Sequence, residues 1–241
     1  MNYKIDISNN LEEIAERFAG ILINTINQNK GQINIALSGG STPKAVFDYL
    51  AKYYNEKIEW NKINFFWGDE RCVPSDHPES NYLMAHNHLF SKIGIHSKNI
   101  FKVDGSIDPE FEAENYSKSI IENVPLQNNI PSFDLVMLGL GEDGHTASIF
   151  PDSINLINDN RICAVAKHPV INQERITLTG TVINNSKRIV FLVTGESKSK
   201  IVDIILNKKE GFKKLPASLV NPIYGKLVWL IDKEAANSIK L

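Results

Sequence analysis

The chain has 241 residues, and its 26 basic and 28 acidic side chains leave a formal net charge of −2. This balance argues against a nucleic-acid or other polyanion-binding surface, and no apolar run approaches the roughly 20 residues that cross a bilayer. The polar N-terminus lacks the apolar stretch of a secretion signal, and two cysteines do not make a disulfide framework. We therefore expect a cytoplasmic protein that binds neither nucleic acid nor a membrane, folded as one domain over residues 1–241.

The chain begins with the patterns of a strand and a long helix. Apolar and polar residues alternate over residues 3–7, and apolar side chains then recur at helical spacing over residues 11–26. Asn9, with Glu12 three residues later, resembles a helix cap with its reciprocal acid.

A second strand and helix follow. Residues 33–37 have the composition of a buried strand, and residues 45–53 that of a helix. Thr42 is the expected cap of this helix, with Pro43 in its first turn, where a missing N–H costs nothing.

The rest of the chain repeats this alternation. The expected elements are a strand over 62–67, helices over 81–90 and 108–123, strands over 133–138, 162–166, 175–179 and 188–193, a helix over 197–206 and a strand over 227–231. Such alternation predicts a three-layer α/β fold, in which a mainly parallel, doubly wound, Rossmann-like sheet carries helices on both faces. Ligands bind such sheets beyond the carboxyl ends of the strands, which directs attention to residues 38–43, 68–80 and 139–151.

The first of these strand ends suits an anion. Gly39 and Gly40 allow a close backbone approach and positive φ, and the following helix N-terminus offers free N–H groups to a phosphate. The hydroxyls of Ser41 and Thr42 could add hydrogen bonds. A tight turn with a helix cap explains the same residues equally well, and the segment is not a Walker loop because its Gly-Lys-Ser/Thr ending is absent.

The third strand end combines a glycine-rich turn with a histidine. Residues 139–144 match G-x-G-x-x-G, but Pro151 would cut a helix within two turns and no acid ends the next predicted strand. The match therefore argues little for a dinucleotide. Asp143 lies two residues before His145, and a histidine that titrates near neutral pH can take a proton from water. A structural histidine that caps the loop is the alternative.

The second strand end carries charge. Arg71 could clamp a phosphate or a carboxylate through two parallel N–H bonds, and Asp69 could hold a sugar hydroxyl. A local ion pair at a strand end is the alternative. Cys72 has no clear base partner in the sequence, and no Cys or His spacing resembles a zinc site.

Taken together, these segments resemble the 6-phosphogluconolactonase family of the α/β type, whose fold is shared with glucosamine-6-phosphate deaminase. The resemblance covers nearly the whole chain, at residues 36–43, 67–74, 77–82, 139–151, 174–179, 193–198, 215–218 and 229–232. Deaminases typically have an aromatic residue at the position of Arg71, and a glutamate in the segment between His145 and the following proline. This chain has neither feature, which favours the lactonase over the deaminase.

The resemblance implies hydrolysis of 6-phospho-D-glucono-1,5-lactone to 6-phospho-D-gluconate, the second step of the oxidative pentose phosphate pathway, with no metal and no cofactor. His145 would be the base that activates water, Asp143 would orient it, and Arg71 would bind substrate and offset developing negative charge. The 6-phosphate would lie on Gly39, Gly40, Ser41 and Thr42, with Lys198 and Arg175 as countercharges.

A non-catalytic sugar-phosphate sensor is a third reading, because sensor domains of some bacterial regulators share this general fold. They normally carry a DNA-binding module, for which the helix expected from residue 11 leaves no room, and the chain is slightly acidic. For the enzyme we expect a monomer or a weak homodimer.

Overall fold

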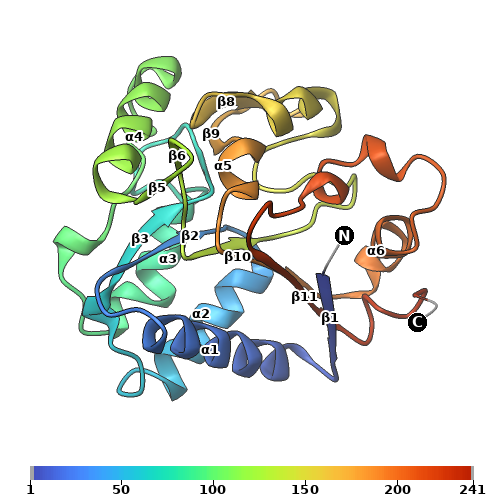
Figure 1. The fold of residues 1–241 in the computed structure, drawn as a ribbon, viewed down its shortest axis with the longest axis horizontal. Helices are drawn as coiled ribbons and strands as arrows, with labels where there is room; N and C mark the ends of the chain where they lie inside the picture. The colour runs from blue at the N-terminus through green and yellow to red at the C-terminus, as the bar shows by residue number, and fades with distance from the viewer. Residues whose placement is uncertain (1–2, 240–241) are drawn as a thin grey trace.

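The computed structural model describes residues 3–239 and is built on a central parallel sheet (Figure 1). All six strands of this sheet run parallel. Their spatial order is β1 (Tyr3–Ser8), β11 (Lys226–Asp232), β10 (Arg188–Val193), β7 (Leu135–Leu138), β2 (Ile33–Leu37) and β3 (Ile63–Trp67). The parallel sheet confirms the predicted fold class.

Both faces of the sheet are apolar because alternate side chains of each strand enter different cores. In β10, Ile189, Phe191 and Val193 belong to one apolar cluster, whereas Val190 and Leu192 belong to the other. This explains why the strands read as continuous apolar runs in the sequence.

Helices cover the two faces in two groups (Figure 1). One cluster takes in side chains of α1 (Leu11–Asn27), α2 (Ser41–Tyr53) and α3 (Asn81–His88). The other takes in side chains of α4 (Pro109–Asn123), α5 (Gly180–Asn184) and α6 (Ser199–Leu206). Within residues 3–239, no helix is long and apolar enough to cross a membrane.

Short elements complete the fold. The 3₁₀ helices are η1 (Trp60–Lys62), η2 (Phe90–Lys92), η3 (Ser97–Asn99), η4 (Pro151–Asn158), η5 (Glu196–Lys198), η6 (Phe212–Lys214) and η7 (Pro216–Leu219). A two-stranded hairpin joins β5 (Leu126–Gln127) to β6 (Ile130–Pro131). Asn128 and Asn129 both have positive φ at its turn, a conformation that asparagine tolerates better than most residues.

A second sheet corrects the prediction for the middle of the chain. The predicted strands at 162–166 and 175–179 do not extend the parallel sheet, but form β8 (Cys163–Lys167) and β9 (Glu174–Leu178) of a separate antiparallel sheet. Its third strand, β4 (Asp69–Arg71), lies in a segment for which no strand was predicted. This sheet packs on the same face as α4 and α5, because its apolar side chains join their cluster.

The predicted helix starts also need correction. Asn10, not Asn9, caps α1 by accepting a hydrogen bond from the backbone N–H of Glu13 at 3.0 Å. The side chain of Glu13, not that of Glu12, returns a bond to the backbone N–H of Asn9 at 2.8 Å. Helix α2 begins earlier than predicted, at Ser41, with Gly40 rather than Thr42 as its cap. Helix α4 was predicted to begin at Asp108, and Asp108 is its cap.

The strand order places a crevice between β2 and β7. From β2 the chain moves to β3 at one edge, whereas β7 continues through β10 and β11 toward the other. Loops that leave two neighbouring strands in opposite directions open a space above their carboxyl ends, where doubly wound folds bind ligands.

Candidate active site

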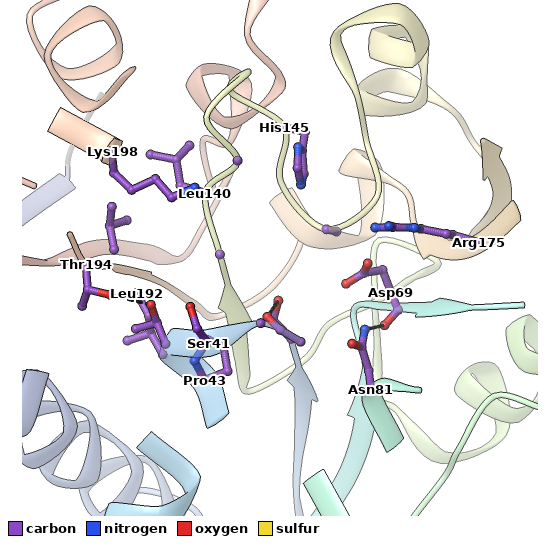
Figure 2. Close-up of a pocket in the computed structure, with 18 of the residues that line it drawn as sticks. Ser41, Pro43, Asp69, Asn81, Leu140, His145, Arg175, Leu192, Thr194 and Lys198 are labelled. Carbon is purple, nitrogen blue, oxygen red and sulfur yellow. Dashed lines mark hydrogen bonds between the residues drawn. The ribbon is translucent and has the colours of Figure 1, made fainter. Parts of the chain in front are cut away.

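A cavity of about 230 Å³ lies at this crevice, lined by loops that follow β2, β7 and β10 and by β4 and β9 (Figure 2). All but one of the predicted site residues line it: Gly39, Gly40, Ser41, Thr42, Asp69, Arg71, His145, Arg175 and Lys198. The remaining one, Asp143, contacts the ring of His145. The fold therefore brings together in one space segments that lie more than a hundred residues apart in sequence.

The floor of the cavity is the glycine turn that leads into α2. Gly40 has a φ of 108° and caps α2 without any side-chain hydrogen bond, so the N–H groups of the first turn are left for a ligand. Gly39 must lack a Cβ, because one would lie 1.9 Å from Oδ1 of Asn81. The hydroxyls of Thr42 and Thr194 are 2.6 Å apart and tie this helix start to the loop after β10.

His145 and Asp143 form a hydrogen-bonded pair in the loop after β7. Nδ1 of His145 lies 2.6 Å from Oδ1 of Asp143, which also accepts the backbone N–H of His145 at 3.1 Å. Burial opposes ionisation of Asp143, but the hydrogen bond and charge of His145 outweigh it, so the pKa of this carboxyl is lowered. An ionised Asp143 only accepts hydrogen bonds, so Nδ1 carries a proton, and in the neutral ring the lone pair lies on Nε2.

The loop that carries this pair contains no helix, which removes the main requirement of a dinucleotide fingerprint. Gly141 must be glycine because a Cβ there would lie 2.1 Å from Nδ1 of His145. Gly144, with a φ of 83°, accepts a hydrogen bond from the backbone N–H of Ala217 at 3.0 Å. The segment of residues 215–218, noted in the sequence without a role, therefore supports this loop.

Asp69 is buried at the wall of the cavity. Its Oδ2 accepts a hydrogen bond from Oγ of Ser148 at 2.7 Å, and its backbone carbonyl accepts one from Nδ2 of Asn81 at 2.8 Å (Figure 2). Sequence reasoning missed Asn81, which lines the cavity, because only the fold brings the start of α3 beside the glycine turn.

Glu70, which sequence reasoning passed over, is 2% exposed and holds the start of α3. Its Oε1 accepts the backbone N–H groups of Arg71 and Asn81 at 2.8 and 2.7 Å. Its Oε2 accepts the backbone N–H of Tyr82 at 2.8 Å and Oγ of Ser80 at 3.1 Å. Burial raises the pKa of Glu70 against the effect of these bonds.

Two arginines are neighbours on adjacent strands of the small antiparallel sheet. Arg71 on β4 is the register partner of Arg175 on β9, a like-charge pairing that is unfavourable without an anion. Arg175 is only 9% exposed, and burial is the main cause that lowers its pKa. Among residues 3–239 the buried Nε atoms of both side chains have no hydrogen-bond partner, although Nη1 of Arg71 donates to the carbonyl of Glu79.

Lys198 faces the cavity from a different side. It lies in η5, and its Nζ is 3.8 Å from a carboxylate oxygen of the exposed Glu142. Figure 2 shows Lys198 and Arg175 on opposite sides of His145. The histidine thus lies between two sources of positive charge.

The described part of the chain holds neither a reactive cysteine nor a cluster of metal-binding side chains. Burial raises the pKa of Cys72 to about 11 and that of Cys163 to about 12, so neither is a thiolate at neutral pH. No group of three or more His, Cys, Asp or Glu side chains within residues 3–239 could hold a metal ion.

Comparison with known proteins identifies relatives over almost the whole chain. The profile of the family described as glucosamine-6-phosphate isomerases/6-phosphogluconolactonase matches residues 7–229. A 6-phosphogluconolactonase of Haemophilus influenzae is 39% identical over 226 residues, which cover 93% of each chain.

Solved structures agree with this match. The 6-phosphogluconolactonase of Trypanosoma brucei superposes with a TM-score of 0.88 at 30% identity and covers 99% of both chains. A monomeric glucosamine-6-phosphate deaminase superposes with a TM-score of 0.82 at 23% identity, covering 98% of this chain and 99% of its own, which shows a shared fold.

Proposed function

The chain belongs to the glucosamine-6-phosphate isomerase/6-phosphogluconolactonase family, and on this premise we propose that it hydrolyses 6-phosphogluconolactone with a water molecule activated by His145. The reaction converts 6-phospho-D-glucono-1,5-lactone to 6-phospho-D-gluconate in the pentose phosphate pathway. The observation that carries the proposal is the shared cavity, in which the imidazole of His145 faces the glycine turn before α2.

His145 supplies the base. With the proton of the neutral ring on Nδ1, Nε2 takes a proton from water as the water oxygen attacks C1 of the lactone. Asp143 holds the ring and stabilises the imidazolium that forms. The tetrahedral intermediate then collapses as the bond between C1 and the ring oxygen breaks, and the proton on Nε2 passes to that leaving oxygen.

Positive charge stabilises the oxyanion of the intermediate. The side chain of Arg71 lines the cavity, and its Nε has no hydrogen-bond partner among the described residues; the buried guanidinium of Arg175 adds to the same positive potential. Charges held in a partly buried site act more strongly than they do in water, because little solvent screens them.

The phosphate of the substrate fits the start of α2. Gly39, Gly40, Ser41 and Thr42 present N–H and hydroxyl groups at a helix N-terminus, and Lys198 supplies a countercharge, with Arg175 as the second candidate. Anchoring the substrate at this remote group positions C1 at the base and lowers the barrier through proximity. A hydroxyl of the sugar reaches Asp69.

We also propose the setting of this activity. The chain acts as one domain over residues 1–241, in the cytoplasm, as a monomer or a weak homodimer that needs no cofactor. Its net charge of −2 supports a small anionic substrate held by local positive charge, rather than a nucleic-acid or membrane partner.

One experiment separates the candidate activities. The protein is incubated in parallel with freshly made lactone and with glucosamine 6-phosphate, and spontaneous lactone hydrolysis is measured without enzyme. We expect acid release above the spontaneous rate and no ammonia. Ammonia from glucosamine 6-phosphate would indicate a deaminase, and the absence of both products would indicate a sensor.

A further inference from the structure

Phe150 is buried in an unusual setting. Its side chain is 1% exposed, yet it belongs to neither of the two apolar clusters formed by the described residues. A buried phenylalanine normally packs among other apolar side chains of the core. The burial of Phe150 therefore needs another explanation.

Three polar side chains contact the Phe150 ring, and two of them, His145 and Arg175, line the active-site cavity. Its centroid lies 4.8 Å from that of the His145 imidazole, with a 50° angle between the planes. The guanidinium carbon of Arg175 lies 5.7 Å from the same centroid, and the ring of His168 meets it at 5.1 Å in a T-shaped arrangement. Contacts of these kinds, between a cation or a heteroaromatic ring and a π face, are favourable.

The backbone of Phe150 is well anchored. Its N–H donates to Oγ of Ser153 at 3.1 Å, and its carbonyl accepts the N–H of Ser153 at 3.0 Å, at the start of η4. The preceding Ile149 donates its N–H to the carbonyl of Thr146 at 3.0 Å. These hydrogen bonds hold the end of the loop that carries His145, and Phe150 lies at that end.

The base needs such a support. The bond to Asp143 holds Nδ1 in place but leaves the imidazole free to tilt about that point. Nε2, the atom that accepts the proton, would move most in such a tilt. A flat apolar group against the ring restricts that motion without competing for the proton.

We propose that Phe150 is a positioning residue of the active site, whose ring holds the imidazole of His145 in the orientation that directs Nε2 toward the substrate. It acts through His145 and also packs against the guanidinium of Arg175. This inference rests on the proposed function, since it assigns His145 as the base.

The test compares F150L with F18L. Phe18 lies in α1, is similarly buried among apolar side chains, and does not line the cavity, so it controls for the loss of a buried ring. Both variants are assayed on fresh lactone with the spontaneous rate subtracted, and the melting temperature of each is recorded. Should F150L not fold, F150M replaces it, because methionine fills irregular apolar spaces.

We expect F150L to lower kcat at least about tenfold, since small displacements of a catalytic group have large effects on rate. F18L should keep kcat within twofold at a similar loss of melting temperature. A double-mutant cycle with H145N, assayed at high enzyme concentration, tests whether the loss of kcat in F150L acts through the imidazole of His145. In the H145N background the F150L change should alter kcat less than twofold, because the group it positions is already gone.

Two results would overturn the inference: a kcat for F150L within twofold of the wild type, or the same fractional loss with and without the His145 imidazole. Failure of the proposed function would look different. In that case H145N alone would keep a kcat near that of the wild type, whatever the effect of F150L.

Discussion

Nδ1 of His145 lies 2.6 Å from Oδ1 of Asp143, and this contact determines which nitrogen of the imidazole can accept a proton. The carboxylate is held two residues before the histidine by the turn of the loop, so the pair forms locally. Its usefulness depends on distant parts of the chain, because the glycine turn after β2, the strands β4 and β9 and the loop after β10 form other walls of the cavity.

Replacing Asp143 with asparagine tests this relationship. The amide of D143N can donate to Nδ1 and so favour the ring tautomer whose Nε2 carries the proton and cannot act as a base. We expect kcat to fall by about 10²-fold or more with a native circular dichroism spectrum. A kcat within threefold of the wild type would show that Asp143 does not set the tautomer.

The same carboxyl gives a pH-dependent contribution to stability. Its pKa is lowered in the folded protein, from a usual value of 3.8, so Asp143 stabilises the fold above that value. The contribution is lost as pH falls through the folded-state pKa. The difference in free energy of unfolding between wild type and D143N should therefore shrink as urea titrations move below about pH 4. A difference that stays constant over this range would contradict the assignment.

Gly141 gives a test of the space around the imidazole. A Cβ at this position would lie 2.1 Å from Nδ1 and 2.5 Å from Oδ1 of Asp143, so G141A must displace the pair. We expect at least about a tenfold loss of kcat. Gly20, in the middle of α1, is the matched control, because a Cβ added there would have nothing within 4 Å. G20A should leave kcat unchanged and stabilise the protein by about 0.5–1 kcal/mol, as alanine favours a helix.

Lys198 can be assigned by comparing two substrates. If its Nζ binds the phosphate equally in the ground and transition states, K198A should raise KM more than it lowers kcat. We expect kcat/KM to fall at least about tenfold for the phosphorylated lactone, and less than twofold for unphosphorylated D-glucono-1,5-lactone. K200A, which removes an exposed lysine two residues away, should change neither value. Equal losses on both substrates would place Lys198 away from the phosphate.

The sequence allowed the main sheet and most of the cavity to be predicted, because both depend on local patterns. Apolar runs and helical periodicity mark β2, β7 and α2, and a doubly wound sheet brings the ends of its strands together. The small antiparallel sheet was not predictable in this way. Its strand β4 consists of three charged residues, which become a buried strand only through pairing with a segment about a hundred residues later.

Sequence analysis missed Glu70 and Phe150 for the same reason: key contacts of each come from other segments of the chain. Nothing local to Glu70 indicated that its carboxylate would be buried against the start of α3. Nothing local to Phe150 marked it as part of the site, since two of the side chains that contact its ring, His168 and Arg175, come from a distant part of the sequence.

Glu70 also gives a stability prediction. The amide nitrogen of E70Q cannot accept the backbone N–H of Tyr82 or of Asn81, so at least one buried donor loses its acceptor. We expect a loss of about 1–3 kcal/mol in the free energy of unfolding, measured by urea denaturation at neutral pH. E122Q, at an exposed position of α4, should lie within about 0.5 kcal/mol of the wild type. If E70Q were as stable as E122Q, Glu70 would not hold the start of α3.

The most direct test of the central claim is the kcat of H145N on freshly prepared 6-phosphogluconolactone, with the spontaneous rate subtracted and KM measured in parallel. Asparagine keeps a polar side chain of similar size but cannot take a proton from water. We predict that kcat falls by about 10²–10⁴-fold while KM changes little, as expected for the loss of a general base. A kcat near that of the wild type would contradict the claim that the imidazole of His145 activates the water.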